Sequence, residues 1–157
     1  MNVFNITSVD HLSMKIFKSI AYIVSYLLFI SVGLGHCQIP CGIYDDMSRI
    51  EQLHEDARTI NKSILKMNEL SGHTDIQSAQ QFIRWVNNKE SHSEAIIQMI
   101  SNYFLTQRIK PSQDDYDQRL KDHHSVIIQA MKVKQSSSLD AAALLTSSIE
   151  KLEQYYD

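Results

Sequence analysis

Apolar residues between positions 50 and 152 recur mainly at intervals of three and four. This spacing places them on one face of an α-helix, whereas a half-buried strand would alternate at every second position. Polar or helix-breaking residues interrupt the pattern at Ser71-Gly72, at Pro111-Ser112 and at the serines of positions 136–138. The whole chain holds four glycines and two prolines, too few for the many turns of a β-protein. The sequence therefore predicts an all-α fold with four amphipathic helices.

The first two expected helices are the longer ones. Ser48 and Glu51 have the spacing of a capping box at the start of the first helix, and Ser71-Gly72 ends it. Its expected inward residues are Ile50, Leu53, Ala57, Ile60, Ile64 and Met67. The second helix is expected from residue 78 to residue 106. Its expected inward residues are Phe82, Trp85, Val86, Ile96, Met99, Ile100, Tyr103 and Phe104.

The third helix is expected to begin at Ser112 and Asp115, directly after Pro111. Its expected apolar face carries Tyr116, Leu120, Val126, Ile127, Ala130 and Met131. The serines of positions 136–138 and Asp140 would cap the fourth helix. Its expected face carries Ala142, Leu145, Ile149 and Leu152. Short polar links between four amphipathic helices predict an antiparallel four-helix bundle over residues 45–157, with a three-helix array or a dimerising helical hairpin as alternatives.

The first 35 residues are predicted to be a targeting segment that is removed. Lys15 and Lys18 supply a positive flank, and an apolar run follows over residues 20–34. Gly33 and Gly35 place small residues at the two positions that a signal peptidase reads. The run is shorter than the roughly 20 residues that a transmembrane helix prefers. We therefore expect cleavage after Gly35 and export to a periplasm or out of the cell, with an uncleaved membrane anchor as the alternative.

Residues 36–157 form a chain long enough for one modest domain with a single core. They carry a small net negative charge, and they contain neither a basic stripe nor a platform of aromatic residues. A basic stripe and an aromatic platform are features of proteins that bind nucleic acids. We therefore expect no nucleic-acid partner, and no membrane partner once the targeting segment is removed.

Cleavage after Gly35 would leave a short segment of metal donors, residues 36–44, at the new N-terminus. This segment reads His36-Cys37-Gln38-Ile39-Pro40-Cys41-Gly42-Ile43-Tyr44 and holds both cysteines of the chain. Two thiolates suit copper(I), zinc, iron–sulfur clusters or nickel, but four-coordinate zinc would need a further Cys or His at a suitable spacing. A terminal amine and the next amide nitrogen, together with two sulfurs, can lie in one plane. That geometry suits nickel(II) or copper(II).

The same segment resembles the nickel hook of nickel-containing superoxide dismutases, whose mature chains begin with the pattern H-C-x-x-P-C-G-x-Y. All six fixed positions of the pattern match residues 36–44. The stretch from Ser101 to Phe104 is also similar to an aromatic segment near the active site of that family. The resemblance implies a four-helix bundle preceded by the hook and assembled as a homohexamer. It further implies one nickel per subunit, alternating between nickel(III) and nickel(II), and conversion of superoxide to dioxygen and hydrogen peroxide.

The resemblance also implies roles for individual hook residues. His36 would supply its α-amine in the plane of the metal and its imidazole as an axial ligand. Cys37 would supply its amide nitrogen and its thiolate, and Cys41 the second thiolate. Tyr44 would lie over the open face of the metal and limit access to it. We therefore expect His36, Cys37 and Cys41 as metal ligands, and Tyr44 with His36 as catalytic residues.

The family supports its axial imidazole with a glutamate on the first helix and an arginine on the second. The candidates for the first position are Glu51, Gln52 and Glu55. Asn88 stands at the expected position of the arginine, and Arg84 or Lys89 could replace it.

The remaining histidines show no metal-binding spacing along the helices. Adjacent helical residues point in different directions, so we expect His123 and His124 at a surface or an interface. His54 and His92 are expected to be solvated, and Trp85 is expected in the core.

Two other functions fit part of the pattern. One is an exported protein that binds nickel or copper in the same hook without turnover. The other is a membrane-tethered helical interaction protein with a Cys37–Cys41 disulfide, the usual state of two cysteines in a secreted chain. For the dismutase we expect superoxide as substrate, further copies of the chain as partners, and a maturation protease.

Overall fold

A computed structural model describes residues 18–20, 22 and 45–156 of the chain. Every regular element within these residues is a helix, which confirms the predicted all-α class. The named elements are α2 (Asp46–Leu70), α3 (Ile76–Met99), η1 (Ile100–Arg108), α4 (Tyr116–Lys134) and α5 (Leu139–Glu153). None of the described helices is long and apolar enough to cross a membrane. The predicted targeting segment and hook fall almost wholly outside the described residues and stay predictions.

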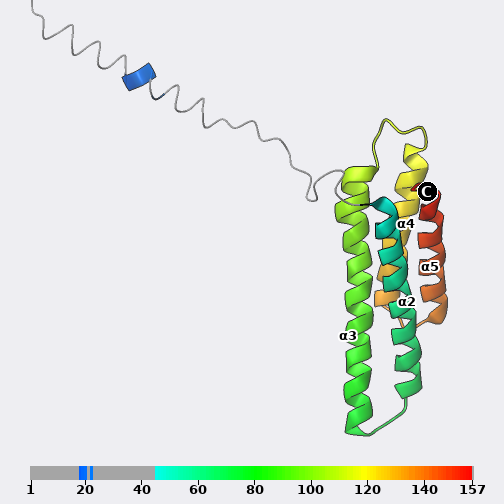
Figure 1. Ribbon diagram of the computed structural model, residues 1–157. Coiled ribbons are helices and arrows are strands. Elements are labelled where there is room, and N and C mark those ends of the chain that lie inside the picture. The colour runs from blue at the N-terminus through cyan, green and yellow to red at the C-terminus, as the bar shows by residue number, and fades with distance from the viewer. Residues whose placement is uncertain (1–17, 21, 23–44, 157) are drawn as a thin grey trace, which may run out of the picture. The chain divides into compact units, whose positions relative to one another are not determined.

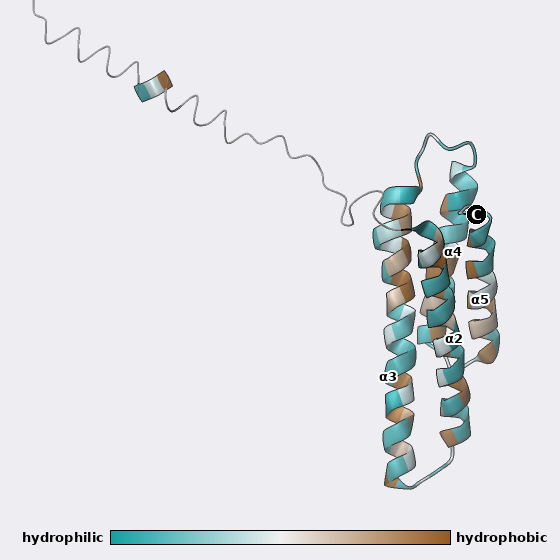
Figure 2. Ribbon diagram, viewed as in Figure 1, coloured by the Kyte–Doolittle hydropathy of each residue, from teal (hydrophilic) through white to brown (hydrophobic). Residues whose placement is uncertain are grey.

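The helices α2, α3, α4 and α5 pack side by side, and successive helices run in opposite directions (Figure 1). Helix α2 contacts α3 and α5, and α4 contacts the same two helices. Hydrophobic and hydrophilic residues alternate along each helix (Figure 2), as expected of amphipathic helices. Their apolar faces meet in one core that includes Leu53, Ile60, Ile100, Leu145 and Ile149.

The inward faces of α2 and α5 agree with the prediction at every residue. Ile50, Leu53, Ala57, Ile60, Ile64 and Met67 of α2 are buried. So are Ala142, Leu145, Ile149 and Leu152 of α5. Burying such aliphatic side chains contributes about 1.5–3 kcal/mol each, which accounts for the strength of the periodic signal.

The first half of α3 is less buried than predicted. Phe82, Trp85 and Val86 are only half-buried, so the prediction that Trp85 lies in the core is wrong. Helices α2 and α3 are longer than α4 and α5, and their hairpin extends past the turn between α4 and α5 (Figure 1). The first half of α3 therefore packs mainly on α2, with fewer neighbours to cover it.

The buried face of α4 is rotated from the predicted face. His123, Val126, Ala130 and Val133 are buried, while the predicted core residues Leu120 and Met131 are 39% and 43% exposed. The polar His123 is buried in the core, where the hydrophobic pattern of the sequence predicts an apolar side chain such as Leu120.

The predicted capping residue agrees with the structure at α5, but the starts of α2, α3 and α4 differ from the prediction by two to four residues. Asp45 rather than Ser48 caps α2, because its carboxylate accepts a hydrogen bond from the amide of Met47 at 2.9 Å. Ser138 caps α5 as predicted. Gly72 follows the end of α2 with a φ of +92°, a conformation that favours glycine.

Candidate functional site

The predicted metal ligands His36, Cys37 and Cys41 lie outside the described residues, as does Tyr44. Their placement stays a prediction. The described chain resumes at Asp45, directly after Tyr44. The start of α2 is therefore the nearest part of the structure to the predicted hook along the chain.

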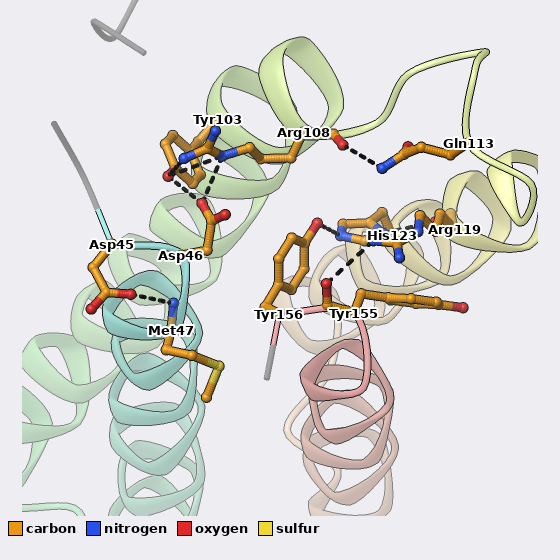
Figure 3. A network of polar contacts seen from close by, with 10 residues as sticks. All are labelled: Asp45, Asp46, Met47, Tyr103, Arg108, Gln113, Arg119, His123, Tyr155 and Tyr156. Atoms are coloured by element: carbon orange, nitrogen blue, oxygen red, sulfur yellow. Dashed lines mark hydrogen bonds and ion pairs between the residues drawn. The ribbon is translucent and has the colours of Figure 1, made fainter. Parts of the chain in front are cut away.

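Asp46, Tyr103 and Arg108 form a polar cluster at this point (Figure 3). Oδ1 of Asp46 accepts hydrogen bonds from the Tyr103 hydroxyl and, at 2.6 Å, from Nε of Arg108. Nη2 of Arg108 donates to the Tyr103 hydroxyl at 2.9 Å, and the guanidinium lies over the Tyr103 ring at 5.2 Å. The cluster joins the first turn of α2 to η1, across 57 to 62 residues of sequence.

Burial and the Asp46 carboxylate shift the titration of this cluster. Burial of Tyr103, followed by its hydrogen bond to Asp46, raises the pKa of the phenol above its usual value. Burial lowers the pKa of Arg108, but its hydrogen bonds to Tyr103 and Asp46 outweigh this effect and leave the pKa raised. At neutral pH the cluster therefore holds a protonated phenol and a charged guanidinium.

The π-helix η1 explains why these side chains converge. Its wider turn is closed by a bond from the amide of Ile109 to the carbonyl of Phe104 at 3.1 Å. Tyr103, Phe104 and Gln107 are all buried within it. Single-turn π segments occur frequently at functional sites, and this one spans nine residues. Periodicity did not reveal it; the only sequence signal was the resemblance of residues 101–104 to an aromatic segment.

A second polar network lies around His123, at the same end of the helices (Figure 3). His123 is fully buried, so the expected surface or interface position is wrong for this residue, whereas His124 is exposed. Nδ1 of His123 lies 2.7 Å from the carbonyl of Arg119, and Nε2 lies 2.8 Å from the hydroxyl of Tyr156. Burial lowers the pKa of His123. The imidazole is therefore neutral near pH 7.

His54 and His92 are half-buried and have partners, whereas solvated side chains were expected. His54 pairs with Glu153 of α5 at 2.7 Å, and His92 pairs with Asp56 of α2 at 2.6 Å. Each partner comes from another helix, and the spacing of residues along one helix cannot reveal it.

Arg108 of η1, which is not among the predicted support residues, bonds to Asp46 in the first turn of α2. Asn88 donates to Ser63 at 3.0 Å, and Ser63 lies about 25 Å along α2 from Asp46 at 1.5 Å per residue. Lys89 binds the carbonyl of Val133 at 2.8 Å, at the C-terminal end of α4. Arg84 is exposed.

The candidate support residues Glu51, Gln52 and Glu55 are exposed on α2 and line a shallow surface depression. Their contact with the His36 imidazole stays a prediction, because His36 lies outside the described residues. Residues 18–20, 22 and 45–156 contain no group of three or more His, Cys, Asp or Glu side chains that could hold a metal ion.

Comparison with known proteins found one matching family. Residues 31–157 match the model of the family described as nickel-containing superoxide dismutase. The match covers the predicted hook and all the named helices. No curated protein and no solved structure matched the chain.

Proposed function

The chain belongs to the nickel-containing superoxide dismutase family, and we propose that its processed form converts two superoxide ions and two protons to dioxygen and hydrogen peroxide. It is an oxidoreductase that uses nickel, with superoxide as its substrate. The observation that carries the proposal is the match of all six fixed hook positions directly after a predicted cleavage site, within the region that matches the family.

The donors of the hook fit nickel by their chemistry. His36 would supply its α-amine and imidazole, Cys37 its amide nitrogen and thiolate, and Cys41 its thiolate. Such a set of nitrogen and sulfur donors suits a square-planar nickel ion. Nickel held by these residues would supply a nickel(III)/nickel(II) redox couple for one-electron chemistry.

The residues of the chain would position the hook and limit access of molecules to the metal. Tyr44 would limit entry to small anions and hold ordered water. Asp45 caps α2, and Asp46 is held by Tyr103 and Arg108, so the backbone directly after Tyr44 is anchored at its exit from the hook. Protons would come from water, from the hook or from Tyr44.

We further propose the architecture and processing of the family for this chain. The closed cycle of contacts among α2, α3, α4 and α5 supports an antiparallel four-helix bundle, and the hook would precede it in the sequence. Removal of residues 1–35 by a maturation protease would create the His36 amine and release an exported protein. Assembly as a homohexamer would place several hooks in one particle.

Metal analysis of the purified native protein, together with the mass of its N-terminus, tests the proposal. We expect a chain that begins at His36, about one nickel per subunit, and nickel-dependent consumption of superoxide. A processed, nickel-loaded chain without turnover would identify a metal-binding protein instead. A functioning protein that still begins at Met1, or that contains a Cys37–Cys41 disulfide, would overturn the hook assignment.

A further inference from the structure

Aromatic rings form a continuous series at the end of the helices where α2 begins. The Tyr103 and Phe104 rings are 5.1 Å apart, centroid to centroid, and Phe104 lies 4.8 Å from Tyr156. Tyr156 in turn lies 6.5 Å from Tyr155. Tyr103 is buried and Tyr155 is partly exposed, so the series leads from the interior to the surface.

The hydrogen-bond direction at Tyr156 follows from the surroundings of His123. The carbonyl of Arg119 can only accept, so Nδ1 of His123 carries the proton and donates to it at 2.7 Å. In the neutral imidazole Nε2 is then an acceptor. Tyr156 therefore donates its phenol proton to Nε2 at 2.8 Å. The imidazole is a base in direct contact with the phenol.

The other two tyrosines of the series also donate to bases. The Tyr155 hydroxyl donates to Oδ2 of Asp122 at 2.6 Å, and the Tyr103 hydroxyl donates to Oδ1 of Asp46. A phenol becomes a strong acid when it loses an electron, so it is easily oxidised only where a base can take its proton. All three phenols have such a base in place.

We propose that Tyr103, Tyr156 and Tyr155 form a chain of redox-active phenols that carries an oxidising equivalent from the interior of the helices to the surface (Figure 3). The hydrogen-bonded base beside each phenol carries this inference, together with the ring contacts that connect them, in which Phe104 lies between Tyr103 and Tyr156.

The step at Tyr156 is a coupled transfer of one electron and one proton. The phenol O–H bond breaks and the proton moves to Nε2 of His123. The electron reduces either the Tyr103 radical, which recovers its proton from Asp46, or a one-electron oxidant such as a carbonate or azide radical, which becomes its anion. Tyr155 then gives an electron to the Tyr156 radical, which recovers its proton from His123, while the Tyr155 proton moves to Asp122. A reductant in solution, such as ascorbate, gives Tyr155 an electron, and Asp122 returns the proton.

The biological use of this series of phenols rests on the proposed function. An enzyme whose substrate is superoxide and whose product is peroxide is exposed to one-electron oxidants. The radical chemistry itself does not depend on nickel. It can therefore be tested on the metal-free full-length protein, and its failure would leave the dismutase proposal standing. Conversely, absence of superoxide turnover in the nickel-loaded protein would not contradict the proposed series of redox-active phenols.

The test generates azide radicals by pulse radiolysis and follows the persisting tyrosyl radical by its electron paramagnetic resonance spectrum and its optical decay. Trp85→Phe serves as the parent, because the single tryptophan also reacts with azide radicals. We expect Tyr156→Phe and His123→Phe to change the spectrum and to shorten the radical lifetime about tenfold, the factor set by one strong hydrogen bond. We also expect the solvent deuterium isotope effect on radical formation to disappear in His123→Phe.

The matched controls are Tyr116→Phe and His124→Phe on the same helix, which should behave as the parent does. Equal radical spectra, lifetimes and isotope effects in Tyr156→Phe, His123→Phe and the parent would overturn the proposal. If His123→Phe loses its helical circular dichroism, Tyr156→Phe and Asp122→Asn decide the matter. An unchanged radical in both variants then overturns the proposal, and a changed radical in either supports it.

Discussion

Lys89 is a charged side chain whose ammonium group lies inside the protein. Only 3% of the residue is exposed, and Nζ donates to the carbonyls of Val133, Lys134 and Ser136 at 2.7–3.0 Å. The last carbonyls of a helix have no partner within the helix. Lys89 of α3 supplies those partners to α4, and it also forms an ion pair with Glu90 at 3.0 Å.

We expect Lys89→Met to destabilise the protein by about 2–3 kcal/mol, because it leaves buried carbonyls without donors. Chemical denaturation followed by circular dichroism measures this loss. Lys66→Met is the control, since Lys66 forms an exposed pair with Glu69 and the change should alter stability by less than about 0.5 kcal/mol. Equal stability of both variants and the parent would contradict the capping role.

His123 links stability to pH. Burial lowers the pKa of the folded imidazole below its unfolded value. As the pH falls through the unfolded pKa, near 6.5, the unfolded chain takes up the proton first, so the free energy of unfolding decreases. The Arg119 carbonyl and the Asp122 carboxylate oppose this shift without reversing it.

We expect His123→Gln to reduce the loss of stability between about pH 7 and pH 5. A glutamine amide can donate to the Arg119 carbonyl and accept from Tyr156, but it does not titrate. The measurement is the midpoint of denaturant unfolding at several pH values, in the variant and in a His124→Gln control. Identical pH profiles for all three proteins would show that His123 does not contribute.

At the scale of elements, η1 and α2 depend on one another through Asp46, Tyr103 and Arg108. Asp46 is in the first turn of α2, and the other two residues lie in the π-helix. Anchoring the first turn of α2 fixes the backbone at the exit of the predicted hook. The contacts are partly exposed, so their free energy is modest, but they act on a helix end that would otherwise fray.

We expect Arg108→Met to speed amide hydrogen exchange in the first turn of α2 and to cost about 1–2 kcal/mol of stability. Exchange measured by mass spectrometry locates the effect. Arg84→Met on the exposed face of α3 is the control and should leave that turn protected. Unchanged exchange in Arg108→Met would show that the cluster does not hold the helix end.

At the scale of the molecule, the described helices share one hydrophobic core. The core residues from Ile50 to Leu152 all lie in α2, α3, η1, α4 and α5. Folding of the helices and binding of the metal are therefore expected to be separable.

We expect Cys37→Ser or Cys41→Ser to abolish nickel uptake while circular dichroism and thermal unfolding stay close to those of the metal-free parent. Metal analysis of the processed variants provides the measurement. Ser136→Cys added to either variant is not expected to restore uptake, because its thiol is not part of the hook sequence of residues 36–44. Unchanged nickel content in either cysteine variant would refute the ligand assignment.

The sequence by itself determined the all-α class, the buried faces of α2 and α5, and the family. Those features follow from local periodicity and from a contiguous motif, which need no knowledge of distant contacts. Only the tertiary structure decided that His123 is buried, that His92 pairs with Asp56, and that Arg108 reaches Asp46. Such pairs depend on the rotation of each helix about its axis and on the offset between neighbouring helices, and periodicity along one helix constrains neither closely enough.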